Sequence, residues 1–86
     1  MPHTAENQSV DLNKATIGQE LIVQKILDKS LALKLMEMGC MPKMQICKQN
    51  AAPFQGPVLI KVFPNGNLLA LRYEEAEKVM VGAAVE

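Results

Sequence analysis

The sequence predicts a mainly β protein: a small, partly open β-barrel of about five strands, with one α-helix inserted after the first strand. Three observations support this prediction. Only residues 30–38 combine a helical pattern with a clear start and a clear end. The other apolar runs are short and rich in aliphatic residues, as is typical of strands. An Asn65-Gly66 pair, typical of a tight hairpin, separates two of these runs. Because strand edges need protection, five short strands in so small a domain favour closure.

The composition is compatible with one small core and excludes several classes of partner. The chain has 86 residues, of which 49% are hydrophobic, and nine basic residues balance nine acidic ones. Nucleic-acid binding and attraction to anionic lipid need a basic patch. We therefore expect that the protein neither binds nucleic acid nor inserts into a membrane. There is no secretory signal, no apolar run of about 18 residues and no disulfide framework. We therefore expect a cytoplasmic protein.

The predicted helix has recognisable boundaries. Ser30 is a candidate N-cap because its hydroxyl can accept from the first turn, and Asp28 is the alternative cap. Gly39 suits the left-handed residue that commonly follows a helix. Pro42 prevents the helix from continuing.

The helix presents two kinds of apolar side chain. Leu31, Leu35 and Met38 recur at helical spacing, so we expect them to face the core. Met36 lies off this stripe and is the methionine that we expect to remain exposed. Methionine is common both as a core filler and on adaptable partner surfaces.

The remaining elements are short. The first strand is apolar on both faces, so we expect the helix to cover one of them. Residues 72–77 suit a single helical turn. The predicted strands are residues 20–27, 43–49, 58–62, 68–71 and 79–81. We expect residues 1–10 to form a flexible N-terminal tail, residues 11–82 the folded domain and residues 83–86 a C-terminal tail.

No catalytic constellation is visible, because the only histidine, His3, lies in the expected tail. We therefore do not expect an enzyme. Two pairs are candidate metal ligands. Glu74 and Glu77 would share one side of a helical turn, and Cys40 and Cys47 could approach across a turn and a strand. The structural alternatives are a solvated helix start for the glutamates and a small core residue for Cys40.

The loop at residues 50–57 contains two prolines, one glycine and an aromatic residue, Phe54. Exposed aromatic side chains on loops often contact partners. Phe54 could equally fold back over the mouth of the barrel. Both interpretations stay open at this point.

Three segments resemble the FeoA family, ferrous iron transport protein A. They are Leu-Met-Glu-Met-Gly-Cys-Met-Pro at 35–42, Ala-Pro-Phe-Gln-Gly-Pro at 52–57 and Leu-Ala-Leu-Arg-Tyr-Glu-Glu-Ala at 69–76. Their order and spacing fit the family pattern, and the resemblance covers residues 12–81. Cys40 stands where the family usually has leucine, and Lys43 where it often has glycine. The turn after Pro42 must therefore form without a glycine at that position.

The resemblance implies an SH3-like β-barrel and an accessory or regulatory role in bacterial ferrous iron uptake. It also implies a partner, the membrane GTPase-transporter FeoB, bound through its cytoplasmic domain. On this interpretation we expect an apolar contact group near the helix end and in the loop. Its members are Leu35, Met36, Met38, Met41 and Phe54.

Alternatives remain. The domain could bind ferrous iron or another transition metal ion directly as a small metal sensor, through the glutamate or cysteine pair. It could bind peptides as signalling SH3 domains do, although three aromatic residues without tryptophan give little material for an aromatic groove. Homo-oligomerisation also stays open.

Overall fold

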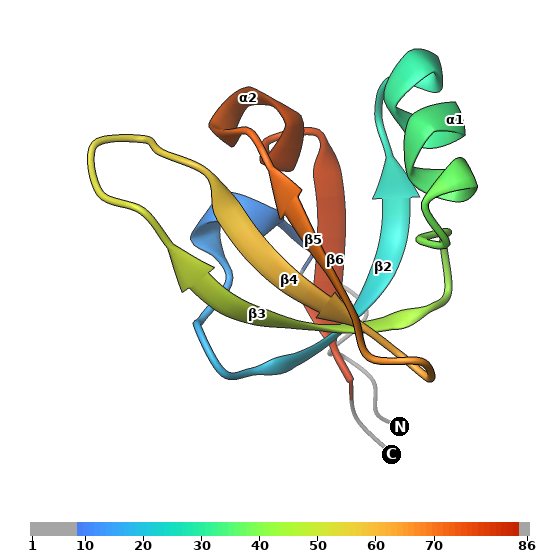
Figure 1. Ribbon diagram of the computed structural model, residues 1–86, viewed down its shortest axis with the longest axis horizontal. Coiled ribbons are helices and arrows are strands. Elements are labelled where there is room, and N and C mark those ends of the chain that lie inside the picture. The colour runs from blue at the N-terminus through green and yellow to red at the C-terminus, as the bar shows by residue number, and fades with distance from the viewer. Residues whose placement is uncertain (1–8, 85–86) are drawn as a thin grey trace.

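The strands of the computed structural model form one antiparallel sheet, in the order β1-β6-β2-β3-β4-β5, which curls into a partly open barrel (Figure 1). The structure describes residues 9–84. The elements are β1 (Val10–Asp11), the 3-10 helix η2 (Leu12–Lys14), β2 (Glu20–Ile26), α1 (Lys29–Glu37), β3 (Gln45–Ala51), β4 (Val58–Val62), β5 (Asn67–Leu71), α2 (Tyr73–Ala76) and β6 (Val79–Ala83). The mainly β, SH3-like prediction is confirmed.

The five predicted strands correspond to β2 through β6, and β1 is a sixth strand that the sequence did not reveal. β1 begins at Val10, the last residue of the expected tail, and ends at Asp11, the first residue of the expected domain; its Val10 pairs with Val81 of β6. β6 runs on to Ala83, one residue past the expected end of the domain. The helix therefore follows the second strand of the chain. Expectations for residues 1–8, including His3, and for 85–86 lie outside the described residues.

The core is aliphatic and fills the inside of the curled sheet. Alternate residues point inward, so β4 buries Val58, Ile60 and Val62 while the residues between them stay half-exposed. The same alternation supplies Leu21, Val23, Ile46, Leu71, Val79 and Val81 from the other strands.

Lys48 is a charged residue in an inward position of β3, and its side chain is only 3% exposed. Its ammonium group donates to the carbonyl oxygens of Asn13 and Ala15, each at 2.9 Å. Burial lowers the pKa of Lys48, and the nearby charge of Asp11 opposes that shift. These two hydrogen bonds of Lys48 therefore join the η2 segment to β3.

Helix α1 begins after Asp28, whose carboxylate accepts from the Ser30 N–H at 3.1 Å. Of the two candidate caps, Asp28 is the observed one, and Ser30 lies inside the first turn. Leu31 and Leu35 are buried as predicted. Met38 is only half-buried, so the predicted core stripe is one residue shorter than expected.

The exit from α1 follows the pattern predicted for its end. Gly39 has a φ of +87°, and the Cys40 N–H donates to the Leu35 carbonyl at 2.8 Å. Cys40 itself is buried in the core. The chain is thus turned back toward β2 directly after the helix.

Lys43 completes this return, and it does so in a left-handed conformation with a φ of +78°. Its N–H donates to the Val23 carbonyl of β2 at 2.6 Å, and the Val23 N–H donates to the Met44 carbonyl at 3.0 Å. The departure from glycine at this position therefore has a conformational cost, since a left-handed backbone disfavours residues with a Cβ.

We predict that Lys43→Gly raises the free energy of unfolding by up to about 1 kcal/mol, because glycine removes the left-handed penalty while the backbone hydrogen bond remains. The Lys43 side chain is exposed, so little packing is lost. Urea unfolding at neutral pH measures the change. Gly39→Ala is the opposite control and should destabilise the protein by about 1 kcal/mol. A destabilised Lys43→Gly variant would contradict this account.

Candidate functional site

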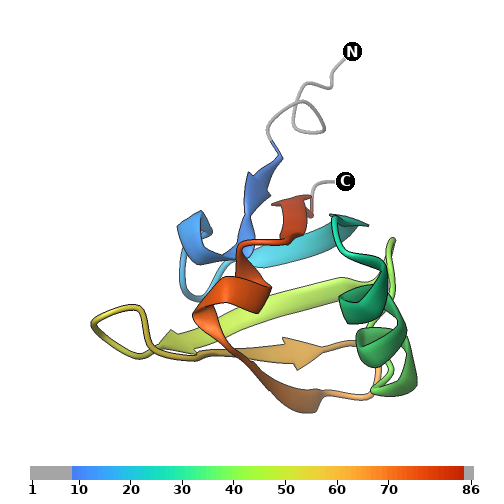
Figure 2. The ribbon, with the colours of Figure 1, turned by 90° about the horizontal axis from the view of Figure 1, so that it is seen from above.

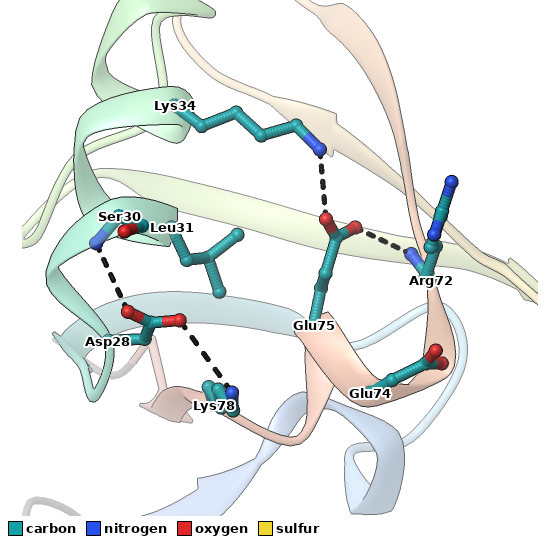
Figure 3. Close-up of a pocket in the computed structure, with 8 residues that line it drawn as sticks. All are labelled: Asp28, Ser30, Leu31, Lys34, Arg72, Glu74, Glu75 and Lys78. Atoms are coloured by element: carbon teal, nitrogen blue, oxygen red, sulfur yellow. Dashed lines mark hydrogen bonds and ion pairs between the residues drawn. The ribbon is translucent and has the colours of Figure 1, made fainter.

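A groove of about 270 Å³ lies between α1 and α2 (Figure 3). Figure 3 shows Leu31 pointing into it from α1. The rest of the lining is polar and carries balanced charge: basic Lys34, Arg72 and Lys78, acidic Asp28, Glu74 and Glu75, and Ser30.

Most of these charges are already paired with one another. The Lys34 ammonium lies 2.8 Å from a Glu75 carboxylate oxygen, and the Lys78 ammonium lies 3.6 Å from Asp28. The second Glu75 oxygen accepts from the Arg72 backbone N–H at 2.9 Å. The hydrogen bond from Lys34, followed by the one from Arg72, lowers the pKa of Glu75. The ion pairs across the groove therefore join α1 to the α2 segment, and we assign the groove a structural role.

The structure does not assemble the candidate metal ligands into one site. Cys40 is buried in the core, where burial raises the pKa of its thiol and disfavours the thiolate that metals bind. Cys47 is half-buried and points to the outer face of β3, because it alternates with inward Ile46.

The glutamate pair is exposed. Figure 3 shows Glu74 pointing away from α1, and Glu77 lies just beyond α2. Within residues 9–84, no group of three or more His, Cys, Asp or Glu side chains gathers as a metal site would require. The described residues thus offer no arrangement that favours the metal-sensing alternative.

The predicted contact group is partly exposed. Leu35 is fully buried and has no surface with which to touch a partner, and Met38 is half-buried. Met36 and Met41 are 47% and 41% exposed. Sequence reasoning missed Leu33, which is 58% exposed and lies one helical turn before Met36. We call Leu33 and Met36 the α1 surface; Met41 lies beyond the end of α1, in the segment before β3.

Phe54 is 99% exposed, so the interpretation that it folds back over the mouth of the barrel is wrong. Its contact with a partner stays a prediction. The loop beneath it is closed by two hydrogen bonds, from the Ala52 N–H to the Pro57 carbonyl at 2.9 Å and from the Gly56 N–H to the Pro53 carbonyl at 3.2 Å. Phe54 and its neighbour Gln55 both have a φ of +60°. Successive left-handed residues are normally Asn and Gly.

The α1 surface and Phe54 do not form one patch. In Figures 1 and 2, α1 and the loop that carries Phe54 lie at opposite ends of the molecule. The single contact group that the sequence suggested is therefore two separate surfaces. In the described part of the chain, no helix has the length and apolar character needed to cross a bilayer.

Comparison with known proteins identifies close structural relatives. A family model described as the FeoA domain matches residues 10–83. A crystal structure of an iron uptake regulatory protein (FeoA) is 31% identical, with a TM-score of 0.76 over 90% of this chain and 99% of that chain. An NMR structure of a FeoA-like protein from Clostridium acetobutylicum is 28% identical, with a TM-score of 0.74 over 92% and 91% of the two chains.

A manganese-dependent transcriptional repressor shares the fold alone. It is 15% identical, with a TM-score of 0.80 over 88% of this chain and 37% of that chain. Comparison with curated proteins finds no significant match.

We predict that Glu75→Gln lowers the free energy of unfolding at neutral pH by up to about 1 kcal/mol, because it removes the ion pair with Lys34. The pKa of Glu75 is depressed in the folded state, so this contribution is present above its ordinary value of 4.5 and is lost as the pH falls through the lowered pKa. Urea unfolding at several pH values should show the two proteins converging in acid. Glu74→Gln is the control and should match the wild type; a difference between wild type and Glu75→Gln that does not shrink in acid would contradict the assignment.

Proposed function

Because this chain belongs to the FeoA family, which is associated with ferrous iron uptake, we propose that it is a cytoplasmic accessory protein that binds the GTP-binding domain of an FeoB-like transporter. Ferrous iron is then the cargo of the transporter and not a ligand of this chain. The proposal is one of protein–protein interaction, without catalysis by this domain.

Phe54 is the observation that carries the proposal. Its ring contributes nothing to the core, since 99% of the residue is exposed. Its backbone is also in a conformation that is unfavourable for a bulky side chain, with a φ of +60°. A residue that costs the fold stability without any packing in return is best explained by a contact outside the chain.

The loop is well suited to present such an anchor. Two prolines and two hydrogen bonds limit its freedom, so little conformational entropy remains to be lost on binding. A single aromatic side chain that enters an apolar pocket can dominate the affinity of an interface. We therefore propose that Phe54 inserts into a pocket of the transporter domain.

The α1 surface is a second contact, at the other end of the molecule. Leu33 and Met36 lie together on the side of α1 that faces away from buried Leu31 and Leu35. Exposed methionine adapts to irregular partner surfaces. A transporter domain that contacted both ends would have to span this protein, so the two surfaces can be tested independently.

Regulation follows if the affinity differs between states of the transporter. A partner that binds one nucleotide state more tightly shifts the population toward that state, by as much as the difference in binding free energy. Measuring affinity with the transporter domain loaded with GDP and with a GTP analogue gives the direction of the effect.

We predict that Phe54→Asn weakens binding to the soluble transporter domain at least tenfold, which corresponds to about 1.4 kcal/mol, while leaving stability unchanged or raised. Asparagine tolerates the left-handed backbone but lacks the ring. Isothermal calorimetry and thermal unfolding measure the two effects. Gln55→Asn relieves the same backbone strain at the neighbouring residue, and this variant should bind the transporter domain like the wild type. Equal affinities for both variants and the wild type would remove Phe54 from the interface.

We further predict that Met36→Asp weakens the same binding severalfold, because it places a charge within the α1 surface. Ile17→Asp is the matched control, since Ile17 is 52% exposed at a distant turn. Co-elution of each variant with the transporter domain, at equal concentrations, compares them. If Met36→Asp and Ile17→Asp co-elute equally well, the α1 surface has no part in docking.

A further inference from the structure

Strand β5 is an unprotected sheet edge. It pairs with β4 on one side, and no described strand pairs with it on the other. Figure 2 shows it in orange along the lower margin of the sheet. Its five residues, Asn-Leu-Leu-Ala-Leu, include no charge and no proline, the features by which proteins usually protect an edge. The opposite edge, β1, is only two residues long and carries Asp11.

The ladder fixes which groups of β5 point outward. The Phe63 N–H donates to the Gln45 carbonyl, so the residue before it, Val62, directs its backbone groups toward β5. Val62 pairs with Asn67, and Ile60 pairs with Leu69. The residues between these partners, Leu68 and Ala70, therefore direct their N–H and C=O groups away from the sheet.

We propose that two copies of this chain pair antiparallel through β5, about a two-fold axis at Leu69. In this register Leu68 of each copy lies opposite Ala70 of the other, and each such pair exchanges both of its hydrogen bonds. The outward backbone groups of both strands are then satisfied, and the two sheets become continuous. The two-fold axis makes the contact self-limiting at a dimer.

The side chains favour a second copy of this chain as the occupant. Leu68 is 57% exposed, whereas Ala70 leaves a small side chain beside half-buried Leu59, its partner on β4. In the proposed register, Leu68 of one copy fills the space over Ala70 of the other and meets Leu59. Across the proposed contact between the two β5 strands, each Leu68 thus lies opposite an Ala70, and the partner copy covers the Leu68 side chain.

Charge also permits self-pairing. A strand that carries a net charge meets its own charge across a two-fold axis, which is unfavourable. β5 has no charged residue, and the flanking Arg72 would lie opposite Gly66 of the other copy, three residues from the axis on either side. No like-charged pair is therefore created along the strand.

The molar mass in solution tests the proposal. We expect sedimentation equilibrium of the full chain to show a monomer–dimer equilibrium that shifts toward dimer as the concentration rises toward the millimolar range. Ala70→Pro removes an outward N–H that β4 does not use, so it should keep the fold and abolish the dimer. Leu68→Lys, which puts like charges on both copies, should also give a monomer. A wild-type protein that stays monomeric throughout would overturn the proposal.

Leu33→Lys is the matched control, because it makes the same change at nearly the same exposure, 58%, but on α1. It should dimerise like the wild type. If Leu33→Lys abolishes the dimer and Ala70→Pro does not, the copies associate through α1 and the β5 proposal is wrong.

Cysteine cross-linking tests the register, in a Cys47→Ser background that removes the one native thiol outside the core. Leu69→Cys places two cysteines opposite each other on the axis, where Cα atoms in a pair without hydrogen bonds lie about 4.5 Å apart and suit a disulfide. It should form an intermolecular disulfide on mild oxidation. Leu68→Cys should not, because its opposite residue is Ala70. The reverse pattern would overturn the Leu69-centred register.

Discussion

The position of helix α1 depends on the turn that returns the chain to β2. Lys43 closes this turn with a hydrogen bond to the Val23 carbonyl, and it adopts a left-handed backbone to reach it. The segment that contains α1 leaves the sheet at the end of β2 and returns to β2 at Lys43. Held at these two points, its Leu31 and Leu35 face the core. The outward side of the helix, with Leu33 and Met36, is then presented to solvent as a consequence of the same constraint.

The ion pairs across the groove reinforce this placement from the opposite side. Lys34 contacts Glu75, and Asp28 contacts Lys78, so α1 is joined to the segment between β5 and β6 as well as to β2. Exposed or half-exposed pairs of this kind are individually weak, and their role is to orient the helix. The groove thus supports the α1 surface without itself being a partner site in our proposal.

The fold separates three exposed features that lie on different parts of the molecule. Helix α1 and the loop that carries Phe54 lie at opposite ends, and β5 forms one edge of the sheet. A dimer joined through β5 would leave Phe54 and Met36 outside the strand pairing. Transporter binding and self-association are therefore separable, and substitutions at Ala70 and at Phe54 report on different contacts.

Local patterns in the sequence determined most of the fold. Short aliphatic runs predicted β2 to β6, Asn65-Gly66 marked the β4–β5 hairpin, and Gly39 marked the end of α1, because each depends on residues close in the chain. Tertiary structure decided which residues that are distant in the sequence lie on the same side of the sheet. Lys48 is buried because the carbonyls of Asn13 and Ala15 converge on it, and spacing cannot reveal that convergence. Long-range strand pairing likewise put Cys40 and Cys47 on different sides of the sheet, and Phe54 far from Met36.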